Sequence, residues 1–349
     1  MKAARFHGRC DLRIDEVEEP APAAGEVKIR NVYVGICGSD LHVYFDPEHC
    51  GLDFSKPHPV TGSMPPQILG HEFSGTVVEL GDGVDDISVG DRVAVWPVYY
   101  CGDCAACRAG MVNICRSFGF HGLTSHGGGL AEYTTVARSM VHRLPEAVDL
   151  KLGALVEPMA VAWHAVAHSG VQPGQAAVIA GAGPIGLGLW FALRARGITN
   201  VVVSDPNTGR RRVAEQLGVP HVIDPLETDL VAVCADLTAG TGADVAFDAA
   251  GTGSAFTQAL DALGPGGRLV VVAVHGKDLD FDTTRLVFSE RSITGSLAYL
   301  PADFEAVIAA MAAGFYDPAG WVEEAAMDDV VATFHRLHEG AGTKVLIRV

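Results

Sequence analysis

From residue 176 onward the chain alternates short β-branched runs with longer helical patterns, and this alternation constrains the fold more than any other feature. We predict strands at 176–181, 201–205, 222–225, 243–251 and 267–274, and helices at 184–197 and 208–218. Strands that alternate with helices in this way form a parallel sheet with helices on both faces. The sequence therefore predicts an α/β, doubly wound domain.

The first 150 residues or so follow a different pattern. Short alternating runs such as 26–35, 75–81 and 91–98 are separated by Gly, Asp and Pro, which is typical of a β-rich domain. The last fifty residues, with an expected helix at 303–313 and a strand at 344–349, could complete either domain. We expect a catalytic domain at 1–155, a nucleotide-binding domain at 156–295 and a closing segment at 296–349 that returns to the first.

The net charge of −17 and the pI near 5.1 make nucleic acid and anionic membranes poor partners. We see no secretion signal at the start and no uninterrupted apolar run long enough to span a membrane. Eight cysteines without such a signal suggest metal ligands rather than disulfides, so we expect a cytoplasmic protein.

Four of the cysteines form a C-x2-C-x2-C-x7-C array: Cys101, Cys104, Cys107 and Cys115. Two-residue spacers let neighbouring thiolates converge on one tetrahedral centre, and four thiolates with no open position describe a structural zinc site. The alternatives are an iron–sulfur cluster, whose usual final x3-C-P is absent, and a set of free thiols. A nucleic-acid-binding zinc module is disfavoured because only Arg108 and Arg116 are basic in this stretch.

A second, open metal site is suggested by residues from three separate segments: Cys37, Ser39 and His42, then His71 and Glu72, then Glu157. A thiolate, an imidazole and a carboxylate would give zinc three protein ligands and leave the fourth position for water or substrate. Each residue alone has an ordinary alternative. Cys37 could be a small core residue, His71 structural, His42 an incidental surface histidine, and Glu157 a helix cap before Pro158.

A dinucleotide site is predicted by the G-x-G-x-x-G motif that follows the 176–181 strand and opens a helix, made of Gly181, Gly183, Pro184, Ile185 and Gly186. Asp205 ends the next strand, where a carboxylate can bind the adenosine ribose and repel a 2′-phosphate. NAD is therefore favoured over NADP. Arg210 and Arg211 keep the alternative open, because a nearby arginine can accommodate that phosphate.

The chain resembles the zinc-containing medium-chain dehydrogenase family. GICGSDLH (35–42), LGHEFSG (69–75), the cysteine quartet, GGGLAEY (127–133) and GAGPIG (181–186) stand in the family's order and spacing. The resemblance implies a GroES-like β-rich catalytic domain and a Rossmann domain. It implies that Cys37 and His71 ligate a catalytic zinc, that Glu72 lies beside the metal, and that Glu157 is a further ligand, direct or through water. Arg210 is implied to pack near the adenosine of NAD.

The same resemblance implies the reaction, which is oxidation of a small secondary alcohol or vicinal diol. Zinc lowers the pKa of a bound oxygen and NAD accepts the hydride. Ser39 and His42 are implied to relay the proton outward through the cofactor ribose. The segments 58–75, 119–133 and 294–304 look most like 2,3-butanediol dehydrogenases, with sorbitol- or threonine-type enzymes as alternatives. A homodimer or homotetramer joined near 285–300 is also implied. A non-catalytic NAD- and zinc-binding protein is the remote alternative.

Overall fold

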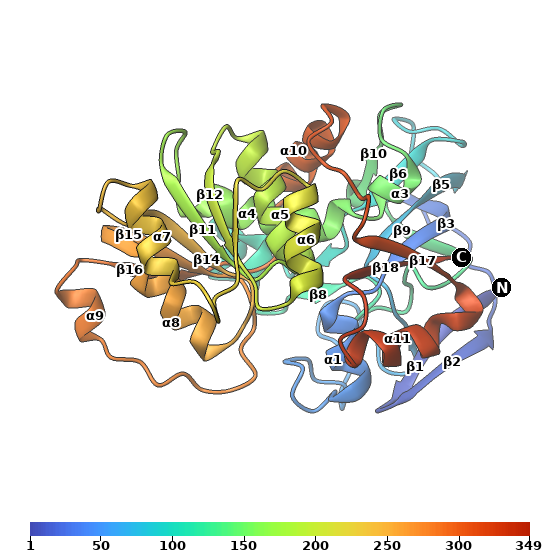
Figure 1. Cartoon of the computed structure of the whole chain (residues 1–349). Helices are drawn as coiled ribbons and strands as arrows, with labels where there is room; N and C mark the ends of the chain where they lie inside the picture. The colour runs from blue at the N-terminus through green and yellow to red at the C-terminus, as the bar shows by residue number, and fades with distance from the viewer. The chain divides into compact units, whose positions relative to one another are not determined.

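The computed structural model describes residues 1–349, which form two compact units (Figure 1). The first unit contains Met1–Glu157, Leu300–Ala313 and Trp321–Val349, and the second contains Pro158–Tyr299 and Gly314–Gly320. None of the helices combines the length and the apolar character needed to cross a membrane.

The first unit is built on a seven-stranded sheet in the order β10-β6-β5-β3-β18-β17, with β9 also paired to β3. Its strands are β3 (Glu26–Gly35), β5 (Glu72–Leu80), β6 (Arg92–Val95), β9 (Tyr133–Ala137), β10 (Val141–Arg143), β17 (Val322–Ala326) and β18 (Lys344–Arg348). A three-stranded sheet contains β1 (Lys2–Gly8), β2 (Asp11–Glu16) and β4 (Gln67–Ile68), and a two-stranded sheet contains β7 (Val98–Tyr99) and β8 (Gly119–Phe120). The pairs are antiparallel except β17 with β18, so the β-rich prediction is confirmed.

Short helices connect these strands: α1 (Gly38–Phe45), α2 (Ala105–Arg108), α3 (Leu150–Gly153), α10 (Pro301–Ala312) and α11 (Val330–His338). Three 3-10 turns cover Val112–Ile114, Arg138–Met140 and Met327–Asp329. The last strand lies centrally, because Leu346 of β18 pairs with Gly35 of β3, and Gly35 also pairs with Glu72 of β5. Residues far apart in the sequence therefore meet where these three strands lie side by side.

The second unit contains a parallel sheet in the order β13-β12-β11-β14-β15-β16. Its strands are β11 (Ala176–Ala180), β12 (Asn200–Ser204), β13 (His221–Ile223), β14 (Ala243–Asp248), β15 (Leu263–Val271) and β16 (Ser292–Gly295). The helices are α4 (Val156–Ser169), which begins in the first unit, α5 (Pro184–Ala195), α6 (Thr208–Gln216), α7 (Leu230–Leu237), α8 (Gly253–Asp261) and α9 (Thr284–Val287). The predicted strand–helix alternation is confirmed. The strand order reverses at β11, the point where open α/β sheets bind ligands.

Candidate active site

The four quartet sulfurs all lie within 4.8 Å of one another. Cys115 Sγ is 3.5 Å from the sulfur of Cys101 and 4.0 Å from that of Cys104, close to the roughly 3.8 Å that a tetrahedron with 2.3 Å zinc–sulfur bonds requires. The backbone N–H of Cys107 donates to Cys104 Sγ. Together with the backbone N–H of Arg116, this hydrogen bond is the main cause that lowers the pKa of the Cys104 thiol to about 6. The geometry and the donor set fit a closed, four-thiolate zinc site.

A second group of donors is formed by Cys37, His71 and Glu72, whose ligand atoms also lie within 4.8 Å of one another. Cys37 is the N-cap of α1, two residues after the end of β3, while Glu72 begins β5 and His71 directly precedes it. His71 and Glu72 are buried, and Cys37 is half-buried. The structure thus brings a thiolate, an imidazole and a carboxylate together from two segments.

Asp40 is a buried carboxylate that sequence reasoning did not single out. One of its oxygens accepts the backbone N–H of Cys37 at 2.9 Å, and the other lies 3.5 Å from His71 Nδ1. Burial alone would lower the pKa of His71, but the charges of Asp40 and Cys37 raise that pKa well above its ordinary value. An acid that faces one ring nitrogen orients the imidazole so that the other nitrogen is available to a metal. The signal in the sequence was an acid three residues after Cys37.

Lys344 is the second functional side chain that sequence reasoning missed. Its ammonium group is buried, hydrogen-bonds to Glu72 Oε2, and donates to the carbonyl of Ile36 at 3.0 Å. Burial by itself lowers the pKa of Lys344, but the nearby charges of Glu72 and Cys37 outweigh it and raise the pKa above its ordinary value. A Cβ at Gly35 would overlap the Glu72 carboxylate, so Gly35 leaves the space that this ion pair fills.

Glu157 is buried near the start of α4 but does not join the three-residue group. Its charge nevertheless contributes to the raised pKa of Lys344, which places it in the same charged neighbourhood. Lys344 therefore has Glu72 as its direct partner and Glu157 as a more distant one.

Ser39 and His42 both belong to α1. Ser39 Oγ lies 3.3 Å from His71 Nε2, beside the group of metal donors, whereas His42 is exposed. Because residues three apart on a helix lie on the same side, Ser39 and His42 are neighbours along one side of α1. Ser39 is at the end of that side next to the metal donors, and His42 is where the same side reaches the surface.

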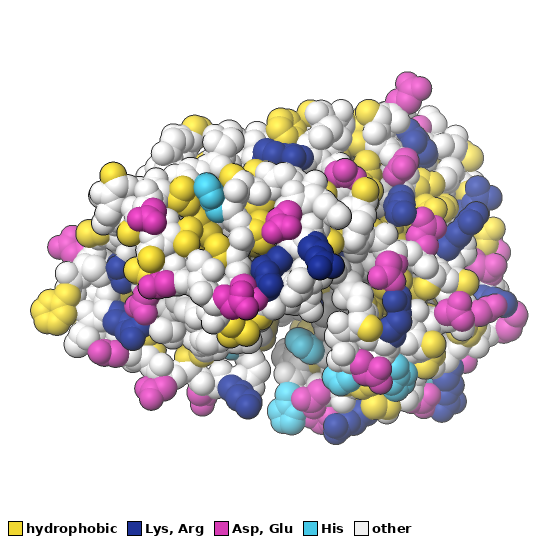
Figure 2. Space-filling view, in the orientation of Figure 1, with side chains coloured by type: hydrophobic (Ala, Val, Ile, Leu, Met, Phe, Trp, Pro, Cys, Tyr) yellow, Lys and Arg dark blue, Asp and Glu magenta, His cyan; other side chains and the backbone are white.

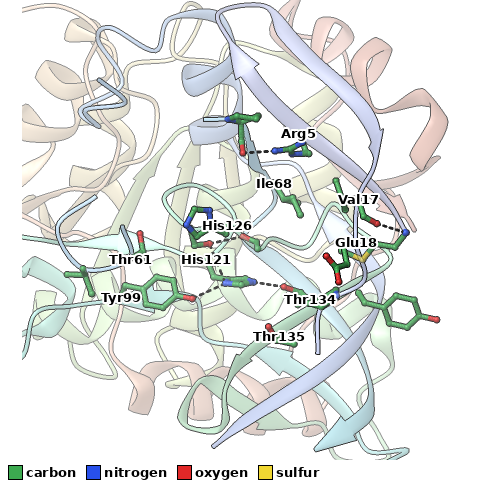
Figure 3. A pocket seen from close by; sticks show the side chains of 17 residues that line it. Arg5, Val17, Glu18, Thr61, Ile68, Tyr99, His121, His126, Thr134 and Thr135 are labelled. Carbon is green, nitrogen blue, oxygen red and sulfur yellow. Dashed lines mark hydrogen bonds between the residues drawn. The ribbon is translucent and has the colours of Figure 1, made fainter. Parts of the chain in front are cut away.

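Two successive residues around β8 point toward different surroundings. The Phe120 ring lies 5.4 Å from the ring of His71 and gives the donor group an apolar neighbour. His121 is buried and hydrogen-bonds to the hydroxyls of Tyr99, at 3.0 Å, and Thr134, at 2.7 Å (Figure 3). Burial lowers the pKa of His121 to about 3. The cleft of about 520 Å³ beside His121 is lined by none of the metal donors.

The glycine-rich loop has the geometry that a dinucleotide requires. Gly181 adopts a φ of 104°, which favours glycine, and a Cβ at Gly186 would overlap the carbonyl of Gly181. Gly183 is the N-cap of α5 without a side-chain cap, and Pro184, Ile185 and Gly186 follow in the first turn. The N-terminus of α5 therefore presents backbone N–H groups of the kind that bind phosphate.

Asp205 directly follows β12 and is 2% exposed. Its two carboxylate oxygens accept the backbone N–H groups of Ala182 and Asn207, each at 2.7 Å. Arg210 lies 3.9 Å from the same carboxylate, whereas Arg211 pairs with Asp224 at 2.8 Å. The acid is thus held against the glycine-rich loop, with the Arg210 guanidinium near its carboxylate and the Arg211 guanidinium donating to its backbone carbonyl at 2.8 Å.

Comparison with known proteins agrees with this architecture. Residues 23–146 match the alcohol dehydrogenase GroES-like domain and residues 184–313 match the zinc-binding dehydrogenase model. The chain is 38% identical to (R,R)-butanediol dehydrogenase of Bacillus subtilis (strain 168), over 100% of this chain and 99% of that protein. It is 39% identical to 2-dehydro-3-deoxy-L-galactonate 5-dehydrogenase of Pseudoalteromonas atlantica, over 91% and 89% of the two chains.

Among solved structures, the crystal structure of 2R,3R-butanediol dehydrogenase from Bacillus subtilis superposes with a TM-score of 0.91 at 38% identity, covering 100% of this chain and 99% of that one. An alcohol dehydrogenase from E. coli in complex with NADH has a TM-score of 0.88 at 28% identity, over 100% and 99% of the two chains. A GroES-like unit, a parallel nucleotide-binding sheet and clustered zinc donors define an alcohol dehydrogenase of the zinc-dependent class. The chain belongs to the zinc-binding, medium-chain dehydrogenase family. The predicted fold class, the enzyme class and the cofactors zinc and NAD are confirmed.

Proposed function

We propose that this enzyme interconverts 2,3-butanediol and acetoin with NAD as the hydride acceptor. The observation that carries the proposal is the convergence of Cys37, His71 and Glu72 within 4.8 Å, in a chain that matches a butanediol dehydrogenase over its whole length. We assign catalysis to the first unit and cofactor binding to the second, which contains the glycine-rich loop and Asp205.

In this proposal Cys37 and His71 hold the catalytic zinc, which lowers the pKa of the substrate hydroxyl when bound. Lys344 occupies one oxygen of Glu72, so we assign Glu157, directly or through water, as the third ligand in the resting enzyme. Glu72 would then lie beside the metal as a carboxylate that can take the place of Glu157 as a ligand. The cysteine quartet holds a second, structural zinc.

Ser39 and His42 form the proposed proton route. The Ser39 hydroxyl lies next to His71, where it can accept the proton of the substrate hydroxyl, and exposed His42 can release a proton to water. The Phe120 ring beside His71 provides an apolar surface that suits the methyl groups of a small diol better than the hydroxyls of a long polyol.

The experiment is a turnover panel with the zinc-loaded enzyme. It compares the three stereoisomers of 2,3-butanediol, acetoin, sorbitol, threonine and a sugar-acid substrate, each with NAD and with NADP. We expect the highest kcat/KM for (2R,3R)-butanediol with NAD. A higher kcat/KM for sorbitol or threonine would move the enzyme to another branch of the family. No turnover with any substrate would support a non-catalytic NAD- and zinc-binding protein.

A second candidate substrate class is favoured by one specific comparison. The relative from Pseudoalteromonas atlantica, whose name states a sugar-acid substrate, is 39% identical to this chain. A sugar acid is larger than butanediol and carries a carboxylate. Turnover of the sugar-acid arm of the panel, with butanediol unreactive, would replace the butanediol assignment.

We also propose a homodimer or homotetramer joined near residues 285–300. β16 is the edge strand of the parallel sheet, and an unpaired edge is a ready site for another strand. Val287 and Phe288 are 72% and 89% exposed beside it, and a hydrophobic side chain projects over α9 in Figure 2. Sedimentation analysis should show more than one chain per particle.

The cytoplasmic location stays a prediction of the sequence.

A further inference from the structure

Asp248 is a fully buried acid at the end of β14, and both oxygens of its carboxylate accept hydrogen bonds. Oδ1 accepts the backbone N–H groups of Ala250 at 3.1 Å and Gly251 at 3.0 Å. Oδ2 accepts a hydrogen bond from His275 Nε2 at 2.7 Å, and the Asp248 side chain has an exposed fraction of 0%. A buried carboxylate with three donors is a strong local anchor.

This anchor joins the segments that surround the glycine-rich loop. The N–H of Ala249 donates to the carbonyl of Ala180 at 2.9 Å, and a Cβ at Gly181 would lie only 3.1 Å from the backbone of Ala249. The carbonyl of Asp248 also accepts the N–H groups that follow β15, at Val272 and Ala273, each at 3.0 Å. Asp248 therefore fixes the turn after β14 and the segment after β15 against the dinucleotide loop.

His275 is the side chain that holds the segment after β15 in place. Its neighbour Val274 is 80% exposed and contributes little packing, and Gly276 is also exposed. The His275 side chain is only 13% exposed and its ring meets Phe256 of α8 edge-on, with centroids 6.0 Å apart. Val272 and Ala273 are held through their backbone, so the hydrogen bond between His275 and Asp248 is the buried side-chain attachment of the exposed part of the segment, residues 274–276.

The strand order indicates which half of the cofactor this segment faces. β12, which precedes Asp205, lies on one side of β11, whereas β14 and β15 lie on the other. A dinucleotide that crosses the reversal point places one nucleotide on each side. Because Asp205 is suited to the adenosine ribose, the segment after β15 is on the nicotinamide side. A cleft of about 920 Å³ lined by His275 and by residues 251–254 and 256–258 opens next to it.

We propose that His275, acting through Asp248, is a positioning residue for the nicotinamide half of NAD. Without it, Asp248 Oδ2 loses its donor and residues 274–276 lose their buried side-chain attachment, while Val272 and Ala273 keep their backbone hydrogen bonds to Asp248. The adenosine side would keep Asp205 and the glycine-rich loop, whose hydrogen bonds do not involve His275. The inference rests on NAD as the cofactor and not on the identity of the alcohol, so it can be tested without any substrate.

The test measures dissociation constants of the zinc-loaded enzyme for NADH and for ADP-ribose, which lacks the nicotinamide ring. The variants are His275→Leu, which removes the donor, and His275→Gln, whose amide can still donate to Asp248. We expect His275→Leu to weaken NADH binding about 10-fold to 100-fold and to change ADP-ribose binding by less than about twofold. His275→Gln should restore most of the NADH affinity.

Three results would overturn the proposal. One is NADH affinity in His275→Leu within about twofold of the wild type. Another is an equal loss for NADH and ADP-ribose, which would indicate a general loosening of the unit. The last is a His275→Gln enzyme as weak as His275→Leu, since the ring's packing rather than its hydrogen bond would then matter. Thermal unfolding followed by circular dichroism verifies that each variant is folded.

Discussion

Replacing Lys344 by methionine tests whether a buried cation holds Glu72 beside the metal. The substitution keeps an unbranched side chain of similar length but removes the charge. Glu72 is 0% exposed, and its Oε1 has no hydrogen-bond partner. In Lys344→Met its Oε2 loses the ammonium group as well. The variant leaves a buried, unpaired carboxylate in the metal-free protein.

Removing one partner of a buried ion pair costs about 3–5 kcal/mol, and we expect that loss in the free energy of unfolding of the metal-free variant. Bound zinc gives the Glu72 carboxylate a new partner, so the zinc-loaded variant should regain most of the loss. Lys151→Met is the matched control, because Lys151 pairs with Glu324 in a half-exposed position. Such a pair contributes about 1 kcal/mol or less.

The assay is urea unfolding of wild type, Lys344→Met and Lys151→Met, each with and without zinc. A cobalt-substituted sample adds a visible spectrum that reports a change of ligand at the open site. An equal loss with and without metal, or a loss as small as that of Lys151→Met, would refute the role of Lys344. So would an unchanged cobalt spectrum.

Three further outcomes follow from the site. The pKa of His121 is lowered to about 3, so the unfolded chain binds a proton that the folded one does not as pH falls below about 6.5. His121 should therefore contribute a loss of about 1.4 kcal/mol per pH unit from there toward pH 3, so that stability falls less steeply in His121→Gln than in wild type; equal slopes in urea titrations would contradict this. Cys107→Ser should retain about one zinc per chain and unfold at a lower temperature, while its affinity for NADH stays unchanged. Two zinc ions per chain in this variant, measured by metal analysis, would contradict a zinc site made of four thiolates. Asp205→Ser should raise KM for NAD and lower the preference over NADP in kcat/KM, and an unchanged ratio would remove Asp205 from cofactor selection.

The features that the sequence predicts well are those encoded locally. The cysteine quartet spans fifteen consecutive positions from Cys101 to Cys115, so spacing alone brings its sulfurs together. The glycine-rich loop follows a buried strand and opens a helix, and its geometry depends on backbone conformations that glycine permits. The alternation of strands and helices likewise fixes the parallel sheet before any long-range contact is known.

The features that the sequence does not reveal depend on long-range pairing. Lys344 lies 272 positions from Glu72 and meets it only because β18 pairs with β3 and β3 with β5. Nothing in the segment 344–349 distinguishes this lysine from one at the start of any strand. His275 meets Asp248 for the same reason, since two parallel strands end together. By contrast, Asp40 lies within the motif GICGSDLH itself. Its role could not be predicted only because the sequence does not show that the His71 ring lies next to it.

The most direct test of the central claim measures zinc content and NADH formation together, in wild type and in Cys37→Ser, with Cys10→Ser as a control. The account predicts about two zinc ions per chain and NADH formation from (2R,3R)-butanediol in wild type and control. Cys37→Ser should retain about one zinc, bind NADH as tightly as wild type, and form no NADH. Undiminished turnover in Cys37→Ser would contradict the claim that catalysis takes place at the Cys37–His71 metal site.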